Sequence, residues 1–139
     1  MPEDEDRPGG LEAGLEATVQ EVVSEALTAR ALGSGDVPLL ATPAVLALAE
    51  RASCQALRGR IRDADTTVGS WVELSHLAPT APGATVAATA RLVKVEGNRL
   101  TFELVVRDGA GEIATGRHGR VVVAREPFIR GASSRAEAR

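Results

Sequence analysis

Residues 42–57 read TPAVLALAERASCQAL and are apolar almost all round. A helix that is apolar on every face is buried in its protein. Thr42 is a good N-cap residue, and Pro43 at the first helical position loses no hydrogen bond that the helix needs. Gly59 supplies a stop signal. The sequence therefore predicts a long buried helix that begins at Thr42 and ends near Arg58.

Two polar residues are out of place in otherwise apolar surroundings. Glu50 lies within the predicted helix, and carboxylates are seldom buried without a partner. We expect Glu50 either to form an ion pair, with Arg51 or Arg58 of another helix, or to take part in chemistry. His76 falls on the apolar face of a predicted strand, where the structural alternative is a core histidine with satisfied hydrogen bonds. Imidazole can move a proton near neutral pH.

The rest of the chain alternates between apolar and polar residues, as strands do. Strict alternation places Gly69 on the opposite face of its strand from His76. Gly97-Asn98 is a two-residue hairpin signal, a second turn is expected at 108–111, and the pattern near 116–119 suggests a bulge. The expected strands are 15–23, 66–78, 84–95, 100–107 and 113–124.

These elements predict an α+β fold, with an antiparallel sheet of about five strands wrapped around one long central helix. The helix would be covered on its other side by curvature of the sheet, by a second subunit, or by both. The domain is expected to span 13–128, with flexible tails at 1–12 and 129–139.

Composition narrows the class of protein. The 139 residues suit one domain, and a net charge of -3 argues against a dedicated nucleic-acid binder. Cys54 is the only cysteine, which excludes an intrachain disulfide and a cysteine-based zinc site. No run of 18 apolar residues exists to span a membrane, and the acidic N-terminus lacks the apolar core of a secretory signal. A cytoplasmic location is expected.

Several short motifs carry a resemblance to a known family, and their joint order and spacing matter more than any one of them. The pattern is similar to the hotdog fold of acyl-CoA thioesterases, and most closely to the fluoroacetyl-CoA thioesterase-like family, from about Leu15 to Phe128. The motifs are Leu40–Pro43 leading into Glu50, Gly69 with Val72–His76, Pro82-Gly83, Val95–Arg99 and Gly116–Arg120.

The resemblance implies a catalytic set of Thr42, Glu50 and His76, with Gly69 near the thioester. It also implies at least a homodimer, and a reaction that needs no metal or cofactor. Arg120 and His118 are candidate substrate-binding residues, although a solvated strand arginine and a structural histidine are the plainer interpretations.

The implied function is hydrolysis of a short or modest acyl-CoA thioester to free acid and coenzyme A. In the family that this chain resembles, the fluoroacetyl-specific member has phenylalanines over its pocket. Segment 29–40 of this chain has no aromatic residue. A non-catalytic acyl-CoA-binding module and an acyl-thioester hydratase or dehydratase remain alternatives.

Helix geometry adds a constraint on this site. Thr42 and Glu50 are eight residues apart, about 12 Å along a helix, so they cannot hydrogen-bond within one chain. We therefore expect the substrate to span them, or the site to combine residues of two subunits.

Overall fold

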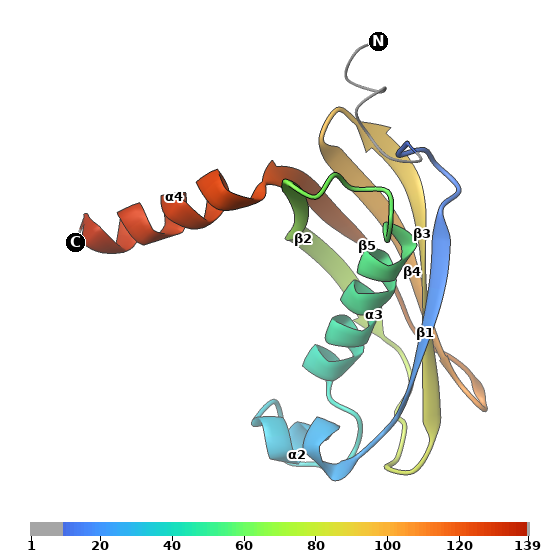
Figure 1. Ribbon diagram of the computed structural model, residues 1–139. Helices are drawn as coiled ribbons and strands as arrows, with labels where there is room; N and C mark the ends of the chain where they lie inside the picture. Colours follow the sequence, from blue (N-terminus) through green and yellow to red (C-terminus); the bar gives the residue numbers. More distant parts are fainter. Residues whose placement is uncertain (1–9, 139) are drawn as a thin grey trace.

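The fold is known from a computed structural model, which describes residues 10–138. One long helix lies against a curved antiparallel sheet (Figure 1). The strands are β1 (Glu16–Val22), β2 (Asp65–His76), β3 (Thr85–Glu96), β4 (Arg99–Asp108) and β5 (Gly111–Ala124). The helices are the short η1 (Glu25–Leu27) and α2 (Ala29–Leu32), the central α3 (Thr42–Ala56) and the C-terminal α4 (Arg125–Glu137).

The sheet has the order β1-β3-β4-β5-β2, and every neighbouring pair is antiparallel. β1 and β2 therefore form its two edges. The hairpin predicted at Gly97-Asn98 joins β3 to β4, and Gly109-Ala110 joins β4 to β5. This arrangement is the five-stranded hotdog architecture that the sequence predicts. The predicted N-terminal tail at 1–12 lies mostly outside the described residues.

The core lies between α3 and the central strands. Alternate residues of β3 and β4 are buried, as the sequence pattern predicts, and each large apolar side chain removed from water contributes about 1.5–3 kcal/mol. The principal core side chains are Val45, Leu48, Leu92, Leu100, Phe102, Leu104 and Val106. Within 10–138, no helix is both long enough and apolar enough to cross a membrane.

α3 is covered on one side only, which differs from the prediction of a helix buried all round. Its inner face packs mainly on β1 and β3, whereas Pro43, Ala47 and Cys54 are exposed. The apolar outer face thus has no cover within the described chain. Sheet curvature alone therefore does not cover this face of α3. A second subunit is the other cover that the sequence predicts.

A bulge lies in β2 rather than at the predicted place in β5. Gly69 pairs with Arg120 and Trp71 pairs with Gly119, so Ser70 is an extra residue in β2. The extra residue shifts the alternation by one position. Gly69 consequently lies on the same inner face as His76, and the prediction that they face opposite sides was wrong.

The C-terminal segment forms a helix instead of the loose tail predicted from its small polar residues. α4 begins directly after β5 and projects away from the body (Figure 1). None of its residues is buried.

Gly116 of β5 allows β2 to approach closely. A Cβ at this position would overlap the carbonyl oxygen of Glu73. We expect Gly116→Ala to lower the unfolding free energy by about 1–3 kcal/mol, as overpacking does, when measured by urea denaturation. Gly109→Ala is the matched control, because a Cβ there would contact nothing, and it should be nearly neutral. Equal stability of both variants would contradict this packing.

Candidate active site

The first cluster joins the start of α3 to the end of β2. A hydrogen bond of 2.8 Å links Thr42 Oγ1 and His76 Nδ1. The N-cap of α3 is Ala41, so the prediction that Thr42 caps the helix was one residue off. Because Thr42 is the first helical residue, its hydroxyl is free to bond the imidazole instead of a backbone N–H.

The other ring nitrogen of the histidine is not satisfied. His76 Nε2 is buried and has no hydrogen-bond partner within the described chain. Buried polar atoms without partners are rare in folded proteins and mark places where function accounts for them. Thr42 and His76 border a cavity of about 400 Å3, whose walls come largely from the loop before α3 and the segment after β2.

The helix start offers one backbone donor to this cavity. Pro43 has no N–H, and the N–H groups of Ala44 and Val45 both bond to the carbonyl of Ala41. The N–H of Thr42 is therefore the donor left without an intrahelical acceptor. It lies at the positive end of the helix dipole, where developing negative charge is stabilised.

The second cluster surrounds the buried guanidinium of Arg120. Its Nε donates to Thr67 Oγ1 (3.0 Å), and its Nη2 donates to the Thr67 carbonyl (3.1 Å). Its Nη1 donates to His118 Nε2 (3.1 Å) and lies 3.4 Å from Glu50 Oε2. Arg120 is only 7% exposed, so its interpretation as a solvated strand arginine was wrong. The cation that pairs with Glu50 is Arg120, and not Arg51 or Arg58.

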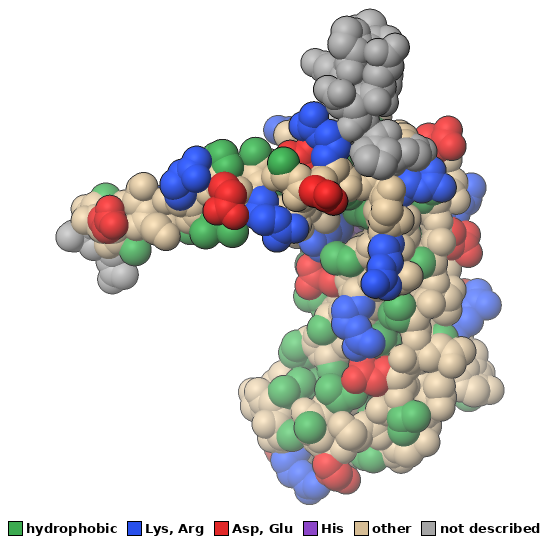
Figure 2. Space-filling model, in the orientation of Figure 1, with side chains coloured by type: hydrophobic (Ala, Val, Ile, Leu, Met, Phe, Trp, Pro, Cys, Tyr) green, Lys and Arg blue, Asp and Glu red, His purple; other side chains and the backbone are tan. Residues whose placement is uncertain are grey.

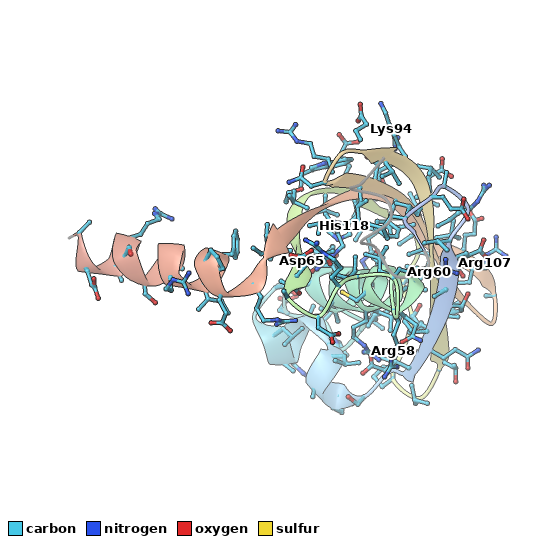
Figure 3. The ribbon with its side chains drawn as sticks, turned by 45° about the horizontal axis from the view of Figure 1, so that its top comes forward. Arg58, Arg60, Asp65, Lys94, Arg107 and His118 are labelled. Carbon is cyan, nitrogen blue, oxygen red and sulfur yellow. The ribbon has the colours of Figure 1, made fainter. Side chains whose placement is uncertain are left out.

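The hydrogen bonds of His118 define its protonation state. Because Arg120 can only donate, His118 Nε2 must be the acceptor, and Nδ1 carries the proton. Nδ1–H donates to the carbonyl of Trp71 (2.9 Å). Burial lowers the pKa of His118 below its ordinary value of 6.5, and the Arg120 charge lowers it further, against the opposing effects of the Trp71 carbonyl and Glu50. Figure 3 shows His118 on the side of the sheet that faces α3.

Gly69 allows the carboxylate of Glu50 to approach the sheet. A Cβ on Gly69 would lie 2.8 Å from Glu50 Oε2 and 3.3 Å from His118 Cε1. The Glu50 side chain is 40% exposed, so its carboxylate is held by Arg120 on one side and open on the other. Glu50, Gly69 and His118 line a second cavity of about 270 Å3.

The structure thus divides the predicted residues between two clusters. Thr42 and His76 come together at one end of α3, and Glu50, Gly69, His118 and Arg120 come together two turns further along. Within one chain the two clusters line different cavities. Sequence reasoning missed Thr67, because a threonine in an alternating strand carries no signal of its role. No group of three His, Cys, Asp or Glu residues within 10–138 is arranged to hold a metal ion.

Comparison with known proteins agrees with this fold. One solved structure, of a fluoroacetyl-CoA thioesterase, superposes with a TM-score of 0.84 at 30% identity, covering 90% of this chain and 97% of that chain. A hypothetical protein of Thermus thermophilus, described as a thioesterase superfamily member, gives a TM-score of 0.83 at 31% identity, covering 92% and 97%. A hot-dog-like protein of Thermanaerovibrio acidaminovorans gives 0.83 at 26% identity, covering 97% of both chains.

Sequence comparison identifies the family within this fold. A profile described as "Fluoroacetyl-CoA-specific thioesterase" matches residues 23–126. A fluoroacetyl-CoA thioesterase of Streptantibioticus cattleyicolor is 36% identical over 90 residues, which span 65% of this chain and 65% of that relative. The fold is therefore that of the hotdog thioesterases. The chain belongs to the fluoroacetyl-CoA-specific thioesterase family.

The neutral state of His118 makes stability depend on pH. Below its ordinary pKa of 6.5 the unfolded chain binds a proton that the folded chain does not, so the unfolding free energy falls as pH falls. We expect this decline between about pH 6.5 and 5, measured by urea denaturation, to be shallower in His118→Gln. Identical slopes in the parent and His118→Gln would contradict the assignment.

Proposed function

We propose that this protein is a thioesterase that hydrolyses a short or modest acyl-CoA thioester to free acid and coenzyme A. Membership of the family supports the reaction class. The observation that carries the proposal is the hydrogen bond between Thr42 and His76 beside a cavity. The helix that holds Thr42 also holds Glu50, whose carboxylate pairs with the buried Arg120.

The first cluster fits attack on a carbonyl carbon. The Thr42 oxygen attacks the carbonyl carbon while its hydroxyl proton passes to His76 Nδ1. Alternatively, the hydroxyl orients a water molecule, which attacks the carbonyl carbon in its place. The free N–H of Thr42 and the helix dipole stabilise the oxyanion, for which one donor is worth about 3 kcal/mol of barrier. As the C–S bond breaks, His76 returns the proton to the departing thiolate of coenzyme A. Where Thr42 has taken up the acyl group, a water molecule then attacks the ester, which releases the free acid and restores the hydroxyl.

Glu50 is the second reactive group, as a base toward water or as a nucleophile. The Arg120 guanidinium donates to Glu50 Oε2 and holds the side chain in place for either role. Gly69 leaves room for the thioester beside this carboxylate. Both a covalent acyl-enzyme and direct attack by water are compatible with these contacts. The reaction as written uses no metal or cofactor.

We propose that the complete site forms between two copies of the chain. About 12 Å of helix separates Thr42 from Glu50, which is too far for both to act on one carbonyl within a chain. Within residues 10–138, β2 lies at the edge of the sheet and pairs only with β5, so its outer backbone groups are open to another strand. The uncovered face of α3 supports the same arrangement. A homodimer located in the cytoplasm is our proposal.

A thiol-release assay across an acyl-CoA panel, with fluoroacetyl-CoA included, tests the activity. We expect Glu50→Gln and His76→Ala each to lower kcat by about 10²- to 10⁴-fold, because each removes a proton-transfer group. Glu21→Gln is the matched control, since that carboxylate pairs with Arg51 at the surface, and it should keep the parent rate. No thiol release from the parent, together with thermal stabilisation by acyl-CoA, would instead indicate a binding module.

Mixing two inactive variants tests the shared site. If Thr42 of one chain works with Glu50 of the other, a heterodimer of Thr42→Ala and Glu50→Gln contains one intact site. Random exchange of subunits should then restore about a quarter of the parent kcat, because half of the dimers are mixed and each has one working site of two. If both residues act within one chain, mixing restores nothing, and the two-subunit site is wrong.

A further inference from the structure

α4 buries none of its residues against the rest of the chain that the structure describes. Its 13 residues are all exposed, Pro127 lies in its first turn, and Gly131 in its interior has a low helix propensity. Isolated helices of this length are marginal in water. Phe128 and Ile129, side by side near its start, are 49% and 53% exposed. Figure 1 shows the helix extending beyond β2, clear of the rest of the molecule.

The position of α4 is fixed by sheet register. Ala124, the last residue of β5, pairs with Asp65, the first residue of β2. α4 therefore leaves the sheet beside the start of its edge strand. A second copy that pairs on this edge would lie directly next to the first turns of the helix.

Strand geometry then indicates which part of the second copy is closest. The dimer proposed above pairs β2 with its copy, and an antiparallel pairing of their full lengths sets Asp65 opposite the partner's His76. α4 consequently emerges beside the segment that follows the partner's β2. That segment begins with Leu77.

An exposed apolar patch lies at that place on each chain. Leu77 is 62% exposed and Val37 is 46% exposed, and both line the cavity that Thr42 and His76 border. Leu32 on α2 is 49% exposed. The space-filling view shows apolar side chains gathered over α2 and the adjoining end of α3, and others along α4 (Figure 2). Apolar surfaces of this kind gain free energy when they cover each other.

Charges on the two surfaces are complementary. Asp36 lines the same cavity, and Arg130 follows Ile129 on α4. Neither has an ion pair among the residues that the structure describes. A carboxylate at the rim of the patch and a guanidinium beside the apolar pair of the helix favour this pairing over a random contact.

We propose that α4 of each protomer packs over the cavity beside Thr42 and His76 of a second copy, with Phe128 and Ile129 against the partner's Leu77 and Val37. The helix thereby supplies one wall of the acyl pocket. Segment 29–40 contributes no aromatic residue to that pocket, and Phe128 would supply one. Of the other two aromatic residues, Phe102 is buried in the core and Trp71 lines the second cavity. This inference rests on the proposed dimer.

Cysteine cross-linking tests the contact directly. In a Cys54→Ser background, which removes the only native thiol, Phe128→Cys and Leu77→Cys are made as separate proteins, mixed and mildly oxidised. The mixed sample should form a disulfide-linked dimer at least about tenfold more than either protein alone, because the two thiols meet only across the interface. Glu103→Cys, exposed on the central strand β4, mixed with Leu77→Cys should give only background.

The oligomeric state separates failure of this inference from failure of the dimer. Light scattering on the same proteins before oxidation reports whether they are dimers. If the proteins are dimers but cross-link no more than the Glu103→Cys control, the proposed role of α4 is wrong and the proposed dimer stands. Monomers overturn both.

Kinetics supply a second measurement. Phe128→Ser with Ile129→Ser should raise KM for acyl-CoA about tenfold with little change in kcat, because it removes apolar contact from the pocket and no reacting group. Ser133→Ala with Ser134→Ala, further along the same helix, is the matched control. An unchanged KM in the double serine variant contradicts the proposal.

Discussion

The buried guanidinium of Arg120 is the interaction on which the arrangement of the second cluster depends. A buried cation needs hydrogen-bond partners, and each of the three nitrogens of Arg120 has one, from Thr67 on β2, His118 on β5 or Glu50 on α3. Three elements are thus held in one register by a single side chain. The same contacts hold His118 neutral and leave the Glu50 carboxylate with one protected and one open side. Structure and reactivity at this position are therefore parts of the same network.

A second constraint is the extra residue in β2. If Ser70 were paired as an ordinary strand residue, strict alternation would turn Gly69 away from Glu50, and the Ser70 side chain would take its place beside the carboxylate. The bulge brings a glycine to the point where the strand passes the Glu50 carboxylate of α3. Bulges beside functional sites commonly redirect a strand in this way.

Much of the fold could be predicted from sequence, because local patterns determine it. Alternation in β3 and β4, the Gly97-Asn98 turn and Pro43 at the start of α3 each carry their own signal. The bulge was misplaced, since Ser70 looks like an ordinary strand residue and only pairing with β5 shows it to be extra. The environment of Arg120 was also missed, because burial of a strand arginine depends on partners 53 and 70 residues away. α4 gave no helical pattern, because apart from Phe128 and Ile129 its residues are small, polar or charged.

Thr42 and Glu50 stand on one continuous helix, and this has a mechanical consequence. In a symmetric pair of chains each helix would contribute its first residue to one centre and its carboxylate to the other. A tilt or slide of that helix on binding acyl-CoA in one centre would displace a reactive group in its twin. The two halves of such an enzyme would not turn over independently, and substrate saturation would depart from a simple hyperbola.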